Sequence, residues 1–140
     1  MKIVLVVGVF DLFHRGHMEL LKAARGFGDR LYVVVNGDDF TAAYKRRPLI
    51  VESDRLAIVS AVRWVDEAVI ANSGDIKPFI ERFNANVIVH GDDWPHDSYM
   101  RQVHLTESYV RDRGIKFVYT PYYQGVSTST LISKIRADEA

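Results

Sequence analysis

The sequence contains no cysteine among its 140 residues. A disulfide framework, a thiolate zinc site, an iron–sulfur cluster and a cysteine nucleophile are therefore excluded. Proline is also scarce, since its four residues are dispersed and no Gly/Ser-rich or Pro-rich linker interrupts the chain. Because 140 residues is close to the commonest domain size, we expect a single domain over residues 1–140.

Long hydrophobic runs and an excess of charge of one sign are missing as well. The apolar run Ile3–Val7 is too short to cross a membrane, and no small-residue cleavage site follows it. Lys plus Arg number 18 and Asp plus Glu number 18, so no strong overall field would attract nucleic acid. We therefore expect a cytoplasmic protein that binds neither membranes nor nucleic acid, while a local phosphate site is still allowed.

Short β-branched and aliphatic runs alternate with helix-like stretches, which is typical of an α/β protein with a parallel sheet. The expected strands are Lys2–Val7, Arg30–Asn36, Glu67–Ala71, Asn86–His90 and Lys116–Thr120. The expected helices are Gly16–Phe27, Ser53–Val62, Asp75–Phe83, Tyr99–Arg113 and Ser127–Ala137. Ser53, Asp75 and Ser127 are each expected to cap the amino end of a helix. Ligands are expected at the charged loops 44–52 and 91–98.

The strongest chemical pattern follows the first expected strand, where the segment from Gly8 to His17 is GVFDLFHRGH. A glycine at a strand end lets a ligand approach the backbone, and the first turn of the next helix offers N–H groups suited to phosphate. His14 and His17 lie three residues apart, so both rings can face one point, with Gly16 leaving space between them. Half of a metal site and a purely structural histidine pair are the alternatives. The context of strand, glycine and helix favours the phosphate site.

This segment and three others together resemble the cytidylyltransferase-like nucleotidyltransferases, and among them the compact glycerol-3-phosphate cytidylyltransferases. The other three are Arg63–Val69 (RWVDEAV), Gly91–Trp94 (GDDW) and Gly125–Ser129 (GVSTS). The resemblance spans nearly the whole chain, with the motifs in the same order. It implies a Rossmann-like five-stranded parallel sheet of order 3-2-1-4-5 with helices on both faces. The active site would lie at the carboxyl ends of strands one and four.

The resemblance also implies a reaction: a substrate phosphate oxygen attacks the α-phosphorus of CTP, pyrophosphate leaves, and a CDP-alcohol forms. Such a reaction needs no covalent enzyme intermediate, so the protein's residues would position the phosphates and stabilise their charge. Mg²⁺ would be held through the phosphates, with no side chain assigned as its ligand. The cytidylyltransferases that the chain resembles are homodimers, and Arg63–Val69 would form the contact.

The site residues that the resemblance implies fall into three groups. The catalytic residues are His14, His17, Lys45, Arg46 and Ser127. Nucleotide binding would add Gly8, Val9, Phe10, Gly16, Arg55, Arg63, Gly91, Asp92, Asp93, Gly125, Thr128 and Ser129. Substrate binding would involve Asp11, Lys45, Trp94, Tyr122 and Tyr123. Ordinary helix capping would need only one of the three hydroxyls at 127–129. Three further histidines match no catalytic element and are interpreted as structural or exposed: His90, His96 and His104.

One segment departs from the family pattern. Where these enzymes have R-T-E-G, this chain has Tyr122–Gly125 (YYQG), so the arginine that would touch phosphate is absent. Either Arg46 or another cation compensates, or the acceptor differs from glycerol 3-phosphate. We favour a different small phospho- or phosphono-alcohol, such as a hydroxyethylphosphonate or phosphoethanolamine. The alternatives are an ATP-using adenylyltransferase of the same fold and a non-catalytic nucleotide-binding regulator.

Overall fold

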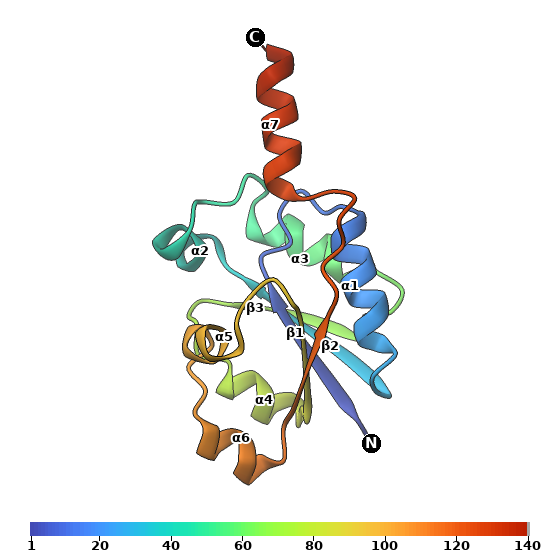
Figure 1. Cartoon of the computed structure of the whole chain (residues 1–140), viewed down its shortest axis with the longest axis vertical. Helices are drawn as coiled ribbons and strands as arrows, with labels where there is room; N and C mark the ends of the chain where they lie inside the picture. The colour runs from blue at the N-terminus through green and yellow to red at the C-terminus, as the bar shows by residue number, and fades with distance from the viewer. Residues whose placement is uncertain (140) are drawn as a thin grey trace.

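The computed structural model describes residues 1–139, which form one sheet and seven helices (Figure 1). The strands are β1 (Ile3–Gly8), β2 (Arg30–Asn36), β3 (Glu67–Ala71), β4 (Val87–Gly91) and β5 (Lys116–Thr120). The helices are α1 (Arg15–Arg25), α2 (Asp38–Tyr44), α3 (Glu52–Ser60), α4 (Lys77–Phe83), α5 (His96–Gln102), α6 (Glu107–Arg113) and α7 (Thr128–Glu139). Every predicted strand is present, and its ends agree with the prediction to within one residue.

All strand pairs are parallel, and the order is β3-β2-β1-β4-β5, which confirms the expected topology. The central strand β1 pairs with β2 over its whole length, from Ile3 opposite Arg30 to Gly8 opposite Val35. The chain order reverses across β1 and β4. Their carboxyl ends therefore form the switch point where ligands bind in open α/β sheets.

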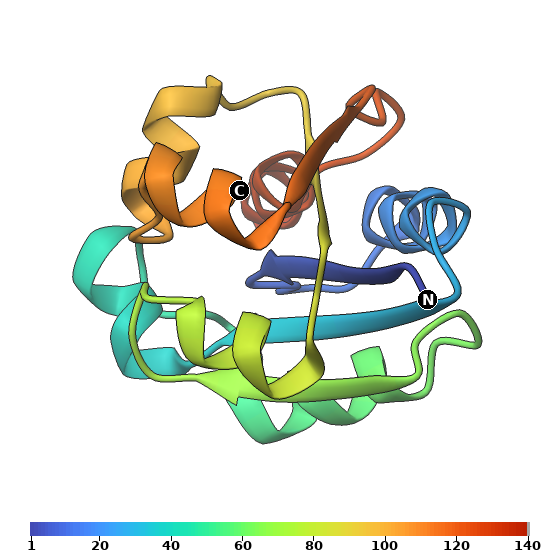
Figure 2. The ribbon, with the colours of Figure 1, turned by 90° about the horizontal axis from the view of Figure 1, so that it is seen from below.

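The two faces of the sheet carry separate apolar clusters, because successive side chains of a strand point to opposite faces. On one face Val4 and Val6 pack with residues of α1 and α3. On the other face Leu5 and Val7 pack with residues of α4 and α5. Helices consequently cover both sides of the sheet, as Figure 2 shows. This double cover explains why the strands are nearly continuous in apolar residues.

The seven-residue helix α2, at Asp38–Tyr44, was not predicted. It is too short to show an apolar period, and its amino end is fixed by tertiary contacts. The Asp38 amide donates to Glu52 Oε1 at 2.9 Å, and the Glu52 amide donates to Asp38 Oδ2 at 3.2 Å. The two carboxylates thus satisfy the amino ends of α2 and α3 reciprocally.

The predicted helix Tyr99–Arg113 is wrong as a single element, because α5 and α6 replace it. His104 between them has a φ of 60°, in the left-handed region that stops a helix. A new helix starts after Thr106, whose Oγ1 accepts from the Tyr109 amide at 3.2 Å. A central left-handed residue and an internal cap together turn the chain between the two short helices.

The predicted helix caps have different outcomes. Ser127 is confirmed, because its Oγ accepts from the Thr130 amide at 3.1 Å. Asp75 accepts from the Lys77 amide at 3.0 Å and so satisfies a donor at the start of α4. Ser53 is wrong as a cap: α3 begins one residue earlier, at Glu52, and Ser53 lies inside the helix.

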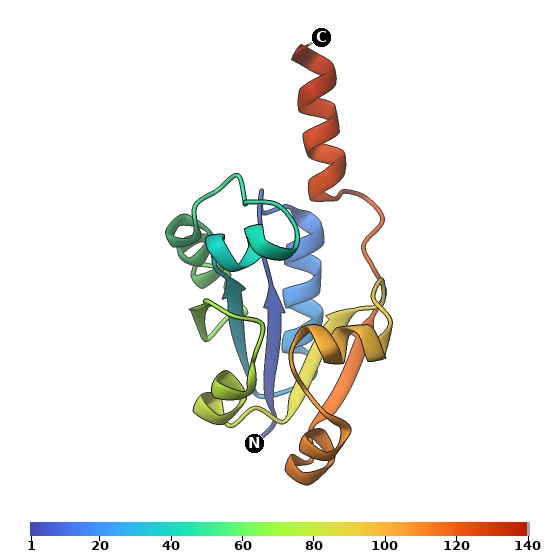
Figure 3. The ribbon, with the colours of Figure 1, turned by 90° about the vertical axis from the view of Figure 1, so that its left-hand side faces the viewer.

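The last helix, α7, stands clear of the body at the carboxyl end of the sheet, as Figures 1 and 3 agree. A connecting segment after β5 carries the chain over that end and delivers the amino terminus of α7 beside the β1–α1 loop. Over residues 1–139, no helix is long and apolar enough to cross a membrane.

Candidate active site

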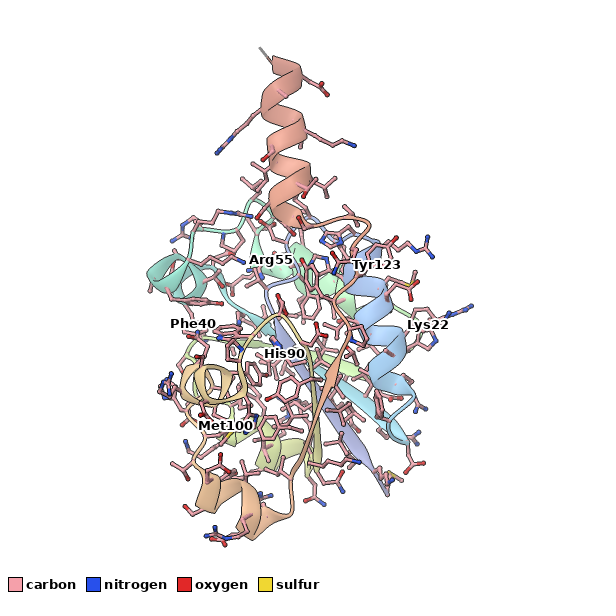
Figure 4. The ribbon with its side chains drawn as sticks, viewed as in Figure 1. Lys22, Phe40, Arg55, His90, Met100 and Tyr123 are labelled. Atoms are coloured by element: carbon pink, nitrogen blue, oxygen red, sulfur yellow. The ribbon has the colours of Figure 1, made fainter. Side chains whose placement is uncertain are left out.

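A cleft of about 1100 Å³ opens at the carboxyl end of the sheet. Its walls come from the β1–α1 loop, one side of α1, the ends of β2 and α2, the loops after β4 and β5, and the start of α7. Residues far apart in the sequence therefore meet at the switch point. Figure 4 labels two of them, His90 near the middle of the molecule and Tyr123 on the connecting segment beside α1.

His14 and His17 stand at the amino end of α1 and cap it with their own rings. The Gly16 amide donates to Nδ1 of His14 at 3.0 Å, and the His14 amide donates to Nδ1 of His17 at 3.1 Å. The rings stack with their centroids 3.9 Å apart. Since each Nδ1 accepts a hydrogen bond, the proton of each neutral ring is on Nε2. Both histidines therefore offer an Nε2–H donor.

Burial keeps this pair uncharged. Burial, together with the neighbouring His14, lowers the pKa of His17 to about 3. Burial also lowers the pKa of His14 below its usual range. Both rings are therefore neutral at physiological pH, and each can donate its Nε2–H to an anion without first gaining or losing a proton.

Gly16 leaves the His14 ring its place, because a side chain at this position would push that ring aside. A Cβ on Gly16 would lie 2.8 Å from Cε1 of His14 and 3.4 Å from the carbonyl oxygen of Val126. The preceding loop is strained, since Phe10 and Leu12 have φ angles of 58° and 48°. Non-glycine residues adopt such angles only where their surroundings impose them, and such residues cluster at functional sites.

Asp11 imposes this loop conformation from the inside. It is only 4 % exposed, and its carboxylate accepts from the amides of Leu49 at 2.8 Å and Ile50 at 2.9 Å and from Arg46 at 3.1 Å. Burial raises the pKa of Asp11, but these donors outweigh burial and hold the pKa below its usual range. Asp11 lines the cleft, as expected for a substrate-binding residue, but its carboxylate also ties the β1–α1 loop to the loop before α3.

Two of the loop cations face the cleft and two other basic residues do not. Lys45 and Arg46 are among the lining residues. Arg47 is exposed and pairs with Asp39 at 2.6 Å. Arg55 has no exposed surface and donates to the carbonyls of Ile50, Val9 and Asn36 and to Asp38. The nucleotide contact expected for Arg55 is therefore replaced by a structural one, because its guanidinium joins the carboxyl ends of β1 and β2 to α2 and α3.

Arg63 lies outside the cleft, contrary to the expected nucleotide contact. It follows α3 and stacks on the Trp64 ring at 4.9 Å. Nearby, the Asp66 amide donates to the carbonyl of Leu31 at 2.9 Å, which places this segment beside the start of β2. The cleft is at the opposite end of the strands, so the length of the sheet separates Arg63 from it.

The start of α7 brings three hydroxyls to the cleft. Ser127, Thr128 and Ser129 all line it, and the Thr128 hydroxyl donates to the carbonyl of Asp11 at 3.0 Å. Ser127 caps the helix, so the amino end of α7 is well formed and faces the same space as the amino end of α1. Two helix amino termini with neutral N–H donors are groups suited to an anion.

The loop after β4 places only some of its predicted site residues in the cleft. Gly91, Asp93 and Trp94 line the cleft, but Asp92 does not. The Asp92 carboxylate instead accepts from the Tyr122 amide at 3.0 Å, and its own amide donates to the carbonyl of Thr120 at 2.9 Å. Asp92 therefore holds the connecting segment in place, and Asp93 is the carboxylate left facing the ligand space.

Comparison with known proteins agrees with this geometry. The model of the family described as cytidylyltransferase-like matches residues 5–134. The chain belongs to the cytidylyltransferase-like family. It is 38% identical to an FAD synthase of Methanococcoides burtonii over 81% of this chain and 75% of the relative. It is 32% identical to an ethanolamine-phosphate cytidylyltransferase of Arabidopsis thaliana, over 98% of this chain but only 33% of that protein.

A third relative, the bifunctional protein HldE of Koribacter versatilis, is 35% identical over 95% of this chain and 27% of its own length. Among solved structures, a lipopolysaccharide core biosynthesis protein from Thermoplasma volcanium superposes with a TM-score of 0.75 and 31% identity, covering 89% of this chain and 99% of that one. The protein is thus a cytidylyltransferase-like nucleotidyltransferase with the fold that the motifs implied.

The cytidylyltransferase-like site also contains residues that the motifs did not identify. His90, Tyr99 and Gln102 line the cleft beside α5, and Asn36 and Tyr44 line it beside α2. His90 is the residue before the GDDW segment, and its position at the end of a buried strand was the one available signal. Tyr44 begins the charged loop 44–52, where a ligand was expected, whereas Tyr99 and Gln102 could not be found in this way because their helix was predicted with the wrong bounds.

Proposed function

We propose that the protein transfers CMP from CTP to the phosphate or phosphonate of a small alcohol. A phosphate oxygen of the acceptor forms a bond to the α-phosphorus, the bond from that phosphorus to the β-phosphate oxygen breaks, and pyrophosphate leaves with the electron pair. The observation that carries the proposal is the pair of neutral Nε2–H donors on His14 and His17. They face the same cleft as the amino end of α7 and the side chains of Lys45 and Arg46.

This set of groups suits a reaction in which negative charge gathers on phosphate oxygens. The histidines would donate to the α- and β-phosphates, and the hydroxyls at 127–129 would hold the β- and γ-phosphates. Lys45 would bring the acceptor phosphate to the α-phosphorus, with Arg46 beside it. Gly8, Val9, Phe10, Gly91 and Asp93 would shape the walls around the nucleotide, whereas Gly125 packs beside the Tyr123 ring and does not line the cleft.

Mg²⁺ fits this site as a partner of the substrate. It prefers oxygen ligands, but the Asp11 carboxylate already accepts from three amides and an arginine. The phosphates of the nucleotide would therefore supply most of its ligands. Bound there, Mg²⁺ would neutralise charge on the departing pyrophosphate.

The relatives named FAD synthase favour a second candidate, an ATP-dependent adenylyltransferase. A nucleotide panel separates the two. Pyrophosphate release is measured with CTP, ATP, GTP and UTP, each with Mg²⁺, against glycerol 3-phosphate, 2-hydroxyethylphosphonate, 2-aminoethyl phosphate and flavin mononucleotide. We expect release with CTP and a small acceptor. Release with ATP alone would refute the cytidylyl assignment, and CTP binding without any release would indicate a regulator.

The same assay tests the histidine pair. His17→Ala removes a donor to the transition state, so we expect turnover to fall by about a hundredfold or more. His96→Ala serves as the matched control, because His96 does not line the cleft. Near-normal turnover of His17→Ala would remove the role proposed for that ring.

We also propose that the protein is a homodimer joined through Arg63–Val69. Part of this segment is β3, an edge strand whose sole sheet neighbour in the described residues is β2. Sedimentation velocity should give a dimer for the wild-type protein and a weaker one for Arg63→Glu. A wild-type monomer with full activity would contradict the interface.

A further inference from the structure

His90 occupies the carboxyl end of β4, in the middle of the molecule (Figure 4). It lines the cleft, and the reaction proposed above makes no use of it. Its ring packs on Tyr99 with the centroids 4.1 Å apart, and it meets Trp94 edge-on at 5.7 Å. These contacts hold the imidazole in one orientation.

The protonation of this ring is decided by a single hydrogen bond. Nδ1 of His90 lies 2.8 Å from the carbonyl oxygen of Gly91. A carbonyl can only accept, so Nδ1 carries the proton, and Nε2 of the neutral ring is a hydrogen-bond acceptor. Burial lowers the pKa of His90, although the Gly91 carbonyl and Asp93 oppose the shift, so the ring is neutral at physiological pH.

The Nε2 atom is available to a ligand. No hydrogen bond among the described residues uses it. Among the described residues, the Tyr99 hydroxyl is the one side-chain nitrogen or oxygen that is both fully buried and without a hydrogen-bond partner. Nε2 of His90 has no partner either, so it must be accessible to solvent. A lone pair on a rigid ring is thus presented to the cleft.

This lone pair is the opposite of what His14 and His17 present. Those two rings offer Nε2–H donors to phosphate oxygens, whereas a phosphate oxygen facing Nε2 of His90 would meet a second acceptor. The group that His90 contacts must therefore carry a hydrogen on oxygen or nitrogen.

The position of His90 indicates which of the two substrates its ring would contact. His90 packs against Tyr99 and Trp94, which belong to the apolar cluster on the α5 face. His17 packs against Phe10 and Phe13, which belong to the cluster on the α1 face. A nucleotide held between the starts of α1 and α7 would leave the α5 side of the cleft for the acceptor.

We propose that His90 is a specificity-determining residue for the acceptor: its Nε2 accepts a hydrogen bond from an O–H or N–H group on the body of the phospho- or phosphono-substrate. This inference rests on the proposed nucleotidyl transfer, because it concerns the second substrate of that reaction. A hydroxyl and an ammonium both supply the required hydrogen. The Trp94 ring, which lines the same cleft, would add to the affinity for an ammonium.

The first test needs no substrate. Imidazole ¹⁵N NMR at pH 7.5 distinguishes the two neutral tautomers, and His90→Phe assigns the signal. We expect His90 to have a protonated Nδ1 and a free Nε2, and His14 and His17 to have the reverse. A protonated Nε2 on His90 would overturn the proposal whatever reaction the protein catalyses.

The second test uses three acceptor probes of similar size: 2-hydroxyethylphosphonate, 2-aminoethyl phosphate and ethyl phosphate, which has no donor on its body. Binding is measured by calorimetry, and turnover is measured with whichever nucleotide gives pyrophosphate release. We expect at least one donor-bearing probe to bind about five- to fiftyfold better than ethyl phosphate. This range corresponds to gaining one hydrogen bond and no longer leaving the His90 acceptor without a partner. The better of the two identifies the donor.

His90→Phe should remove this preference and leave the KM for the nucleotide unchanged, while His90→Gln, which retains an acceptor, should restore part of it. His96→Phe is the matched control outside the cleft. A preference that survives in His90→Phe, a rise in the nucleotide KM alone, or failure of both donor-bearing probes to bind would overturn the proposal. Release with ATP in place of CTP would refute the proposed function but leave this inference standing if the donor preference persists.

Discussion

Replacing Asp11 by asparagine tests whether this carboxylate has a structural role or binds substrate. In the native protein Oδ1 accepts from the amides of Leu12 and Ile50, and Oδ2 accepts from the Leu49 amide and from Arg46. The asparagine side chain has one oxygen, so whichever way it turns, its NH₂ group faces a backbone N–H. The loop conformation that these bonds support is then left with an unpaired donor.

The size of the effect follows from those contacts. Hydrogen bonds to a charged acceptor are worth roughly 1.5–3 kcal/mol each, and leaving a buried donor unpaired costs about 1–3 kcal/mol. Because part of the loss is recovered by relaxation of the loop, we expect Asp11→Asn to lower the free energy of unfolding by about 3 kcal/mol. Lys45 and Arg46 lie on the released loop, so turnover should fall as well.

Urea denaturation followed by circular dichroism measures this loss, with Asp39→Asn as the matched control. Asp39 is exposed and pairs only with the exposed Arg47, so its change should stay within about 0.5 kcal/mol. An unchanged denaturation midpoint for Asp11→Asn, together with a raised KM for the acceptor, would refute the structural role and restore the substrate-binding one.

The remaining predictions concern pH and three other side chains. The folded protein holds the pKa of Asp11 below its usual range, so the ionised carboxylate adds to the free energy of unfolding above about pH 4. This stabilisation is lost as the pH falls through the folded pKa. Acidification below about pH 4 should therefore lower the free energy of unfolding of the wild type more than that of Asp11→Asn. Arg55→Met removes the guanidinium that donates to Asp38 and to three carbonyls, and should cost about 3–5 kcal/mol in urea denaturation. Tyr99→Phe removes a buried hydroxyl that has no partner and should leave the protein equally stable or more stable by up to about 1 kcal/mol, whereas a loss of more than 1 kcal/mol would show that the hydroxyl is paired. Arg63→Ala should leave the nucleotide KM within about twofold of wild type, since Arg63 is outside the cleft, and a tenfold rise would contradict that placement.

The strands and the β1–α1 loop were predictable because their signals are local. A strand buried on both faces is an apolar run whatever lies around it, so its bounds can be found from the sequence to within one residue. The loop from Gly8 to His17 combines a tight turn, a helix start and two rings within ten residues, and the two hydrogen bonds that orient the rings of His14 and His17 close within that segment.

The short helices were less predictable because distant residues decide them. α2 begins where Glu52, fourteen positions away, accepts from its first amide, and no local pattern reveals that contact. The break between α5 and α6 depends on a left-handed His104, a conformation that its sequence context does not require. Helices of seven residues are stabilised by tertiary contacts more than by their own propensity.

The sequence alone determined the order of the strands, the family, and the place of His14 and His17 at the start of the first helix, since each of these depends on patterns within a short stretch of chain. Only the tertiary structure decided the tasks of the charged residues. Burial and partners gathered from several elements assign Asp11 and Arg55 to internal hydrogen bonds and leave Lys45, Arg46 and Asp93 facing the cleft. The same holds for His90, because the proton on a histidine follows from the atom its ring meets in space, and a sequence does not contain that distance.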